Sequence, residues 1–311
     1  MRKNDPKEYP KTYLAQTGGS IKPAGEIIFD PALRQFPRAF RPAAPQFDSP
    51  EEKARWRQAR WTVIGHLLRI VGESPCRDSL VLRGSLLLKT WLTGVAREPG
   101  DIDWVVRPVT AGITDPTATR MFDDLIRAAQ NQRIISDIAI LGDRIAVDDI
   151  WTYERVPGKR IVFPWRADGL PDGAVQMDFV FGEILHTAPS LMPIVIDGNA
   201  VSVWAATPEE SLAWKLLWLE TDGFPQGKDL YDAVLLAERT YLPWNLLHKV
   251  LSADDWFRSN GQNKELFELG DLEWDDFKRE HPDIEGDAFH WQKRLRTALA
   301  RTLAERDAAS L

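Results

Sequence analysis

The sequence contains a single cysteine and no long apolar run. Cys76 stands alone among 311 residues, which excludes an intrachain disulfide. No segment approaches the roughly 18 consecutive apolar residues that a membrane-spanning helix requires. The opening segment MRKNDPKEYPKTYLAQ also lacks the apolar core of a secretory signal. We therefore expect a cytoplasmic protein that has no membrane partner.

The sequence also lacks an excess of positive charge. Its net charge of -7 argues against a generally basic nucleic-acid-binding protein. The charge is unevenly placed, because residues 1–50 are net basic whereas residues 265–287 are rich in Asp and Glu. We interpret the acidic stretch as a solvated face, and a docking surface for a basic partner is the alternative. Basic surfaces are expected only locally, for example at Arg34, Arg38 and Arg41.

Proline and helix-start signals divide the chain into three regions. Residues 1–48 are punctuated by proline without a sustained period, which predicts an extended, solvated N-terminal arm. Ser49 is followed by proline and two glutamates, a pattern that predicts a capped helix start. The same pattern recurs at Thr207. We therefore expect a core over residues 49–204 and a helical lobe over residues 205–311.

Apolar spacing predicts an α+β fold, with a mixed or antiparallel sheet flanked by helices. Core helices are expected over 85–93 and 116–131. Strands are expected over 79–83, 101–106, 147–156, 159–165 and 174–183, and Pro-Gly and Asp-Gly turns favour antiparallel pairing of the last three. Helices of the lobe are expected over 208–222, 229–238 and 289–306.

Asp101 and Asp103 are the most informative pair of residues. In an extended strand, residues i and i+2 point to the same face, so these two carboxylates would stand together. Two like charges held that close are unfavourable unless a cation lies between them. Carboxylate oxygens are hard ligands of the kind that suit Mg²⁺. The pair therefore predicts a metal site, and a solvated strand edge is the alternative.

Gly84 and Ser85 lie upstream of this pair, between an apolar run and a helix-like run. Backbone N–H groups at a strand-to-helix turn have no partner within the helix, and they favour a negatively charged ligand. A phosphate-binding turn beside a metal site indicates phosphoryl or nucleotidyl transfer.

Four sequence blocks stand in an order that is typical of one family. They are LRGSLLLKTWL with REPGDIDWVV, then AVQMDFVFGEIL, then TPEESLAWKLLWL, then GKDLYDAVLLAE. Together they resemble the AbiEii/AbiGii family, the toxin subunits of type IV toxin–antitoxin and phage-defence systems. This family belongs to the polymerase-β-like nucleotidyltransferase superfamily, and the resemblance covers roughly residues 60–240.

The resemblance implies a two-metal site. Asp101 and Asp103 would hold Mg²⁺ ions that bridge the nucleotide phosphates. Asp178, in the third strand of the antiparallel set, would complete the second metal site and help to deprotonate an attacking hydroxyl. The alternative for Asp178 is an incidental acid near a turn.

The resemblance also implies a set of nucleotide-binding residues. Gly84 and Ser85 would bind the β- and γ-phosphates, and Lys215 would contact the triphosphate as a point charge. Asp229 matches a family carboxylate that supports the site, and Asp232, one turn further along the helix, would share that role. The alternatives are a surface lysine at Lys215 and a helix cap at Asp229.

The implied function is Mg²⁺-dependent transfer of NMP from an NTP to an acceptor hydroxyl, with release of pyrophosphate. The resemblance favours RNA as the acceptor, in particular the tRNA 3′ end, and a toxin held in check by a separately encoded antitoxin. A protein side chain or a cationic small molecule such as an aminoglycoside is the alternative acceptor, and the net charge of -7 suits it better. A degenerate, non-enzymatic binding module is the third possibility.

Overall fold

A computed structural model of the chain describes residues 9–20, 26–152, 156–260, 266–270 and 272–309. Its centre is a mixed sheet of nine strands. These are β3 (Leu80–Arg83), β4 (Ile102–Val106), β5 (Ile134–Ile135), β6 (Ile138–Ile140), β7 (Ala146–Thr152), β8 (Val156–Ala167), β9 (Gly173–Val180), β10 (Ser190–Ile196) and β11 (Asn199–Ala205). The order across the sheet is β10-β11-β3-β4-β9-β8-β6-β5, and β7 pairs with β8.

The pairing confirms the expected α+β fold with a mixed sheet. Strands β7, β8 and β9 are antiparallel, as the turns between them predict. Strand β4 instead pairs in parallel with β9, and β11 pairs in parallel with β3. Strands β10 and β11, which the sequence analysis did not identify, form a hairpin at one edge of the sheet. Parallel pairing of β4 with β9 places Asp103 of β4 beside Asp178 of β9, and this contact assembles the site.

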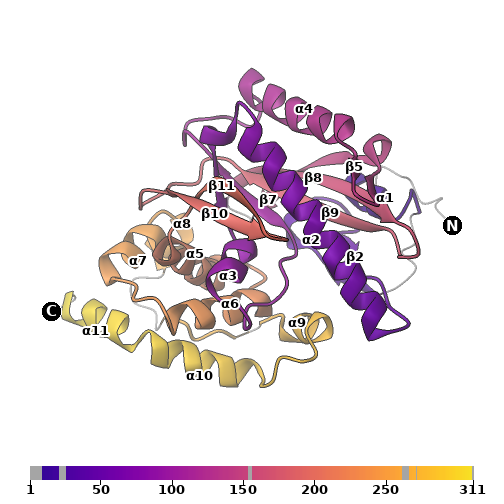
Figure 1. Cartoon of the computed structure of the whole chain (residues 1–311). Helices are drawn as coiled ribbons and strands as arrows, with labels where there is room; N and C mark the ends of the chain where they lie inside the picture. The colour runs from indigo at the N-terminus through magenta and orange to yellow at the C-terminus, as the bar shows by residue number, and fades with distance from the viewer. Residues whose placement is uncertain (1–8, 21–25, 153–155, 261–265, 271, 310–311) are drawn as a thin grey trace.

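Two helices cover one face of the sheet. Helix α2 (Pro50–Glu73) lies diagonally across it, and α4 (Pro116–Asn131) packs beside α2 (Figure 1). Helix α2 begins as predicted, because the Ser49 side chain accepts a hydrogen bond from the backbone N–H of Glu52. Its apolar stripe is fully buried, with Val63 and Leu68 at 0% exposure. The polar side chains of the site therefore gather on the opposite face.

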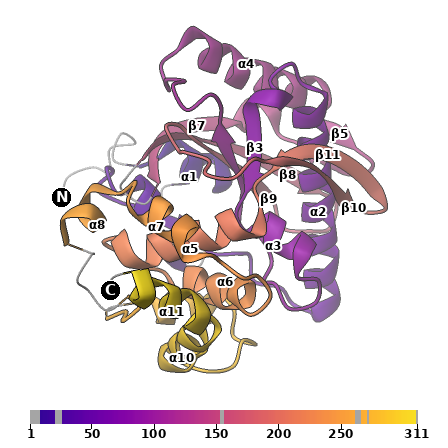
Figure 2. The same ribbon diagram turned by 90° about the vertical axis from the view of Figure 1, so that its left-hand side faces the viewer.

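The helical lobe packs below that opposite face (Figure 2). It contains α5 (Pro208–Thr221), α6 (Gly227–Ala237), α7 (Trp244–Leu251), α8 (Asp255–Asn260), α9 (Trp274–Glu280), α10 (Ala288–Ala298) and α11 (Ala300–Ala309). Helix α3 (Ser85–Trp91) lies between the sheet and α6. None of the helices in the described ranges is both long and apolar enough to cross a membrane.

The prediction of one helix over residues 289–306 is wrong. The chain leaves helical geometry at Leu299, with φ −88° and ψ 4°, and α10 and α11 are separate helices. The two helices pack against different neighbours, α10 against α6 and α11 against α7. The Thr302 hydroxyl donates a hydrogen bond of 2.6 Å to the carbonyl oxygen of Leu242, which fixes α11 in its own direction.

The described N-terminal residues, 9–20 and 26–48, are called the N-terminal segment below. They carry α1 (Lys11–Gln16) and a hairpin of β1 (Ile27–Phe29) and β2 (Phe40–Pro42). The expectation of a solvated arm differs from this structure, because Tyr13 and Leu33 are buried against Ile150 of β7. These elements are too short to show a hydrophobic period, so no pattern in the sequence indicates them. The division of the chain at residues 48 and 204 stays a prediction.

Candidate active site

A row of charged residues crosses the sheet on neighbouring strands. Arg83 of β3 stands opposite Asp103 of β4, Asp103 opposite Asp178 of β9, and Asp178 opposite Arg160 of β8. Asp148 of β7 continues the row beyond Arg160. Residues directly opposite one another share a face of the sheet and lie close together. The row therefore brings two carboxylates side by side at its centre, with an arginine on each flank.

Three carboxylates meet at the centre of this row. Asp101 immediately precedes β4, Asp103 lies in it, and parallel pairing adds Asp178. One side-chain oxygen from each lies within 4.8 Å of the others. Asp178 is 6% exposed, whereas Asp101 and Asp103 are half-buried. The structure thus brings together the three acids that the sequence analysis selected, and we call them the carboxylate triad.

The triad carries more negative charge than its surroundings offset. Burial raises the pKa of Asp103 well above its usual range, and the charges of Asp101 and Asp178 raise it further against the opposing effect of Arg83. Burial also raises the pKa of Asp178 and outweighs Arg160. The pKa of Asp101 is lowered, because Lys228 and other cations outweigh the effect of burial. Closely spaced hard oxygen donors of this kind fit a divalent cation such as Mg²⁺.

The predicted strand-to-helix turn lies directly against the triad. Gly84 has φ +81°, and a Cβ atom placed on it would come 2.1 Å from Oδ2 of Asp103. Only glycine combines that backbone conformation with so close an approach. The hydroxyl of Ser85 is buried and has no hydrogen-bond partner among the described residues. The turn therefore holds a hydroxyl without a partner in the described part of the chain, on the residue that follows the glycine in contact with Asp103.

Lys215, Asp229 and Asp232 form a buried group with Arg97, called the lobe network below. The Lys215 ammonium lies 2.7 Å from Oδ1 of Asp229 and 3.0 Å from Oδ2 of Asp232. Arg97 donates two hydrogen bonds, of 3.0 and 2.8 Å, to the two oxygens of Asp232. Burial lowers the pKa of Lys215, but the two aspartates outweigh it and the pKa is raised. Two cations thus balance two carboxylates, and none of the four lines the cavity described below.

Comparison with known families identifies the protein. The family model described as nucleotidyl transferase AbiEii toxin, type IV TA system, matches residues 66–302, about three quarters of the chain. The chain belongs to this family. No curated protein matches it. The match makes this AbiEii-family protein a nucleotidyl transferase, as the resemblance implied, and a toxin of a type IV toxin–antitoxin system.

A second buried charged group of the AbiEii-family protein escaped the sequence analysis. Arg160 donates one hydrogen bond of 2.9 Å to each oxygen of Asp178. Its third nitrogen bonds to Asp30 of the N-terminal segment, and the Tyr13 hydroxyl donates to the same carboxylate over 2.8 Å. We call Tyr13, Asp30, Arg160 and Asp178 the N-terminal network. Asp30 and Arg160 are 130 positions apart in the sequence, so no local pattern indicates this network.

A cavity of about 100 Å³ opens on the triad of this transferase. The N-terminal segment supplies one wall, which includes Phe29 and Arg41. The loop before α6 and the start of α6 supply another, with Phe224 and Lys228, and Phe29 packs edge-on against Phe224 at 5.2 Å between ring centroids. Lys228 and Arg41 are cations that the sequence analysis did not assign to the site. Both line the same cavity as the three carboxylates of the triad.

Proposed function

We propose that this AbiEii-family transferase uses Mg²⁺ to move NMP from an NTP to an acceptor hydroxyl, with the tRNA 3′ end as the acceptor. The observation that carries the proposal is the carboxylate triad, whose ligand oxygens lie within 4.8 Å of one another on adjacent parallel strands. Asp101, Asp103 and Asp178 would hold the metal ions. When bound, Mg²⁺ neutralises phosphate charge in the transition state and orients the reacting oxygens.

The residues of the turn and of the cavity wall would position the triphosphate. The buried Ser85 hydroxyl and the backbone N–H groups at Gly84 and Ser85 would donate to phosphate oxygens. Lys228 and Arg41 line the cavity, so we propose that these two cations meet the triphosphate. Lys215 does not line the cavity, and we propose that its charge, which reaches Asp103, also attracts the triphosphate. Asp229 and Asp232 hold the Lys215 ammonium in place for that role.

The reaction would be an in-line displacement at the α-phosphorus. The acceptor oxygen forms a new bond to that phosphorus, while the bond from the phosphorus to the bridging oxygen of the β-phosphate breaks and pyrophosphate leaves. Asp178 would accept the proton of the attacking hydroxyl.

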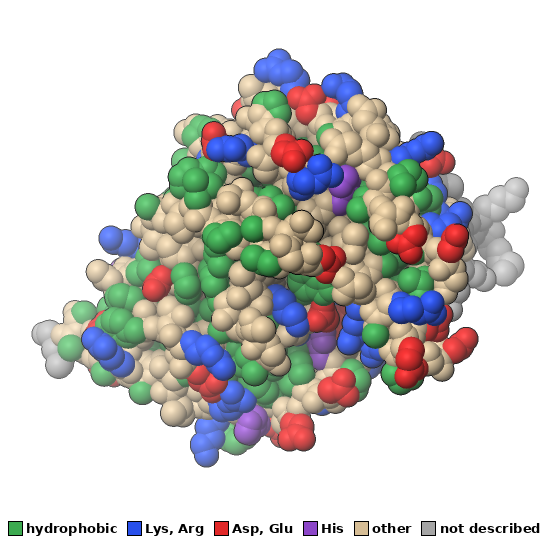
Figure 3. All heavy atoms as spheres, viewed as in Figure 1, with side chains coloured by type: hydrophobic (Ala, Val, Ile, Leu, Met, Phe, Trp, Pro, Cys, Tyr) green, Lys and Arg blue, Asp and Glu red, His purple; other side chains and the backbone are tan. Residues whose placement is uncertain are grey.

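Addition of a nucleotide to the tRNA 3′ end would block aminoacylation, and a separately encoded antitoxin would restrain the enzyme. On the face shown in Figure 3, the Lys and Arg side chains of the described residues are interspersed with Asp and Glu. Together with the net charge of -7, this mixed face supports RNA held locally at the active site.

One observation favours a different acceptor. The cavity is lined by eight carboxylates and only three cationic side chains. Such a lining attracts a cation, so a small cationic molecule such as an aminoglycoside is the second candidate acceptor. A protein side chain is the remaining alternative acceptor, and the transfer assay described next distinguishes it from the other two.

The test is transfer of label from each of the four α-labelled NTPs, with Mg²⁺, to total tRNA, total protein or an aminoglycoside. We expect label in tRNA, and loss of a metal ligand in Asp103→Asn should lower the rate by more than about 100-fold, since even supporting residues of metal sites cost 10–100-fold. Asp123→Asn, at an exposed position on α4, is the matched control and should transfer normally. Label confined to protein or to the aminoglycoside would overturn the tRNA assignment, and undiminished transfer by Asp103→Asn would overturn the proposed site.

A further inference from the structure

The N-terminal network fixes both oxygens of the third triad carboxylate. The two bonds from Arg160 to Asp178 are each 2.9 Å, which is the fork geometry that a guanidinium makes with a carboxylate. Arg160 and Asp178 are also register partners on neighbouring strands, so the backbone holds the pair in place. A carboxylate offers about four lone-pair sites. The fork takes two, and the Gln176 amide, which donates to Oδ2 over 3.1 Å, takes a third, so one remains for a cation.

Asp30 fixes Arg160 from the other side. The side chain of Asp30 is itself held by the Tyr13 hydroxyl, over 2.8 Å, and by the backbone N–H of Ala32, over 3.2 Å. Asp30 and Arg160 are 7% and 3% exposed. Because one guanidinium serves two carboxylates, the group of Asp30, Arg160 and Asp178 keeps one net negative charge. Asp178 can therefore attract a cation although an arginine is bonded to it.

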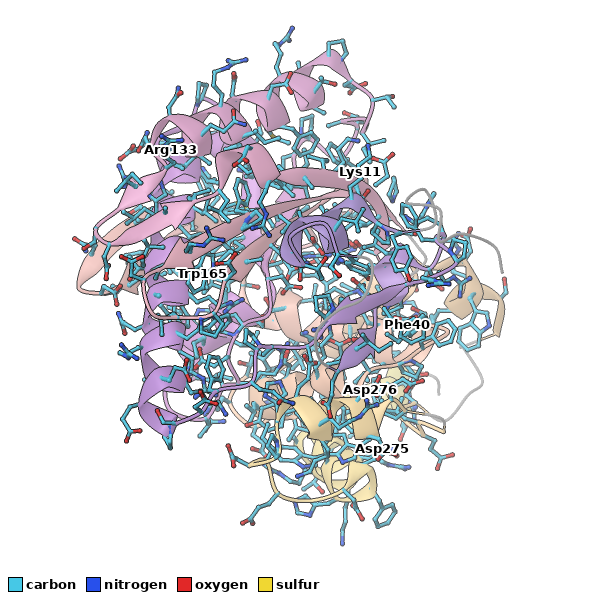
Figure 4. The ribbon with its side chains drawn as sticks, turned by 90° about the vertical axis from the view of Figure 1, so that its right-hand side faces the viewer. Lys11, Phe40, Arg133, Trp165, Asp275 and Asp276 are labelled. Carbon is cyan, nitrogen blue, oxygen red and sulfur yellow. The ribbon has the colours of Figure 1, made fainter. Side chains whose placement is uncertain are left out.

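The N-terminal segment is anchored at both of its ends. In α1, the N–H and hydroxyl of Thr12 both donate to Oδ2 of Asp148, each over 2.7 Å. At β2, Arg41 makes bonds of 2.8 and 2.9 Å to Glu280 of α9. Figure 4 shows Phe40 of the hairpin between the sheet and Asp276 of α9. The segment thus bridges the core and the lobe, and it carries Asp30 into the site between these two anchors.

We propose that Asp30 and Arg160 are positioning residues of the transferase, through which the N-terminal segment sets the orientation and the net charge of Asp178. This inference rests on the proposed function, because it takes Asp178 to be a metal ligand. It assigns a role to a residue that lies outside the family match, since Asp30 precedes residue 66. A buried cluster of ionic groups is weak evidence for stability, so a role at the metal site is the better account of it.

Two substitutions separate geometry from charge. Arg160→Lys keeps the positive charge but cannot form the fork, and Asp30→Asn keeps the shape but removes one negative charge. The chain offers a matched control on the same strand, because Arg166 makes an equivalent fork with Asp172, with two bonds of 2.8 Å, at the protein surface. Arg166→Lys and Asp172→Asn repeat the two changes away from the triad.

The direct readout is the Kd for Mn²⁺ without nucleotide, measured from the electron paramagnetic resonance signal of free Mn²⁺. Steady-state transfer to the acceptor accompanies it. We expect Arg160→Lys to raise the Kd by about 10-fold and to lower kcat by about 10–100-fold, with the KM for NTP changed less than about 3-fold. Asp30→Asn should act in the same direction by about 3–10-fold, below the 10–100-fold typical of residues that bond directly to a metal ligand, because Asp30 acts through Arg160. Both control variants should match the wild type.

Partial unfolding would give a different result. It would lower the number of Mn²⁺ sites without changing the Kd of the sites that remain. If Arg160→Lys folds poorly, as judged by its thermal melting, the milder Asp30→Asn decides the question. The double variant should lose less than the product of the two single losses, because both residues act at Asp178.

Wild-type Mn²⁺ affinity and kcat in folded Asp30→Asn and Arg160→Lys would overturn the positioning role and leave the proposed function standing. A wild-type protein that binds no Mn²⁺ and releases no pyrophosphate would instead overturn the proposed function, and this inference would fail with it. Equal losses in the Arg166→Lys control would show a general effect of strand β8 and would likewise overturn the proposal.

Discussion

Two buried charge networks stand on either side of the triad, and they differ in what they touch. The lobe network is closed, because Lys215 and Arg97 are matched by Asp229 and Asp232. The N-terminal network is open, because Arg160 must serve both Asp30 and a member of the triad. Among the described residues, the lobe network makes no hydrogen bond to the triad and acts on it only through the charges of Arg97 and Lys215. The N-terminal network instead bonds directly to Asp178.

The two networks also join different parts of the chain to the site. The lobe network joins α5 and α6 to Arg97 and holds the lobe against the core. The N-terminal network ties the catalytic row of the sheet to a segment that lies outside the family match. We therefore expect substitutions in the lobe network to lower folding stability and use of the NTP but to spare metal binding, and substitutions in the N-terminal network to change mainly the metal site.

The largest expected effect is the loss of stability in Lys215→Met. This change leaves two buried carboxylates, Asp229 and Asp232, with one cation, Arg97, which bonds to Asp232. Removal of one partner from a buried ionic group costs about 3–5 kcal/mol. Urea unfolding measures the free energy of unfolding. Lys249→Met, at an exposed position on α7, should cost less than about 0.5 kcal/mol. A loss below about 1 kcal/mol in Lys215→Met would contradict the closed network.

The next effect concerns the turn that lies between the two networks. Gly84→Ala places a Cβ atom 2.1 Å from Oδ2 of Asp103 and imposes φ +81° on a residue with a side chain. We expect a loss of about 1–3 kcal/mol and a fall in transfer activity, because Asp103 must move. Gly94→Ala is the matched control, since Gly94 has φ +88° with no atom within 4 Å of the added Cβ. If both variants lose equal stability and activity, contact with Asp103 plays no part.

The two networks should also differ in how far an added metal ion stabilises the folded protein, and this effect on stability is smaller. A cation that binds the folded state at ten times its Kd stabilises it by about 1.4 kcal/mol, which a thermal melt with Mn²⁺ detects. Asp178→Asn removes a triad ligand and should abolish this gain. Asp229→Asn weakens the lobe network and should retain most of it. If Asp229→Asn loses the gain as completely as Asp178→Asn, the lobe network is not closed.

The sequence predicts the centre of the site better than its flanks. The spacing of Asp101 and Asp103 determines that their side chains share a face, so this part needs no knowledge of the fold. Asp178 and Lys215 were selected by a family resemblance that the family match confirms, and their roles stay predictions. Arg160 and Asp30 were missed, because strand register and a contact over 130 residues decide their positions.

Some features of the fold were present in the sequence and were overlooked. The turn between β10 and β11 is Asp197-Gly198, both with positive φ, which is a standard hairpin signal between two apolar stretches. The break between α10 and α11 differs, because the four-residue spacing of Trp291, Leu295 and Leu299 runs through it. Only the packing of α10 and α11 on different helices decides that the chain bends there.

The smallest expected effect is a pH dependence on the lobe side, at His281. Burial and the nearby charge of Arg97 lower its pKa to about 4, against an ordinary value of 6.5. Between pH 6.5 and 4 the unfolded chain therefore binds more protons at this residue than the folded protein does, so acidification destabilises the fold. Because the imidazole is partly exposed, we expect a loss on the order of 1 kcal/mol across this range rather than the full value of the shift.

The measurement is the free energy of unfolding at several pH values, compared between the wild type and His281→Gln. The difference between the two should grow as the pH falls from 6.5 to 4 and should level off below it, whereas His248→Gln, at an exposed site, should follow the wild type. A difference that stays constant with pH would show that His281 titrates normally in the folded protein. Neither burial nor the charge of Arg97 would then act on the imidazole, and the charge of Arg97 would be taken up by Asp232 within the lobe network.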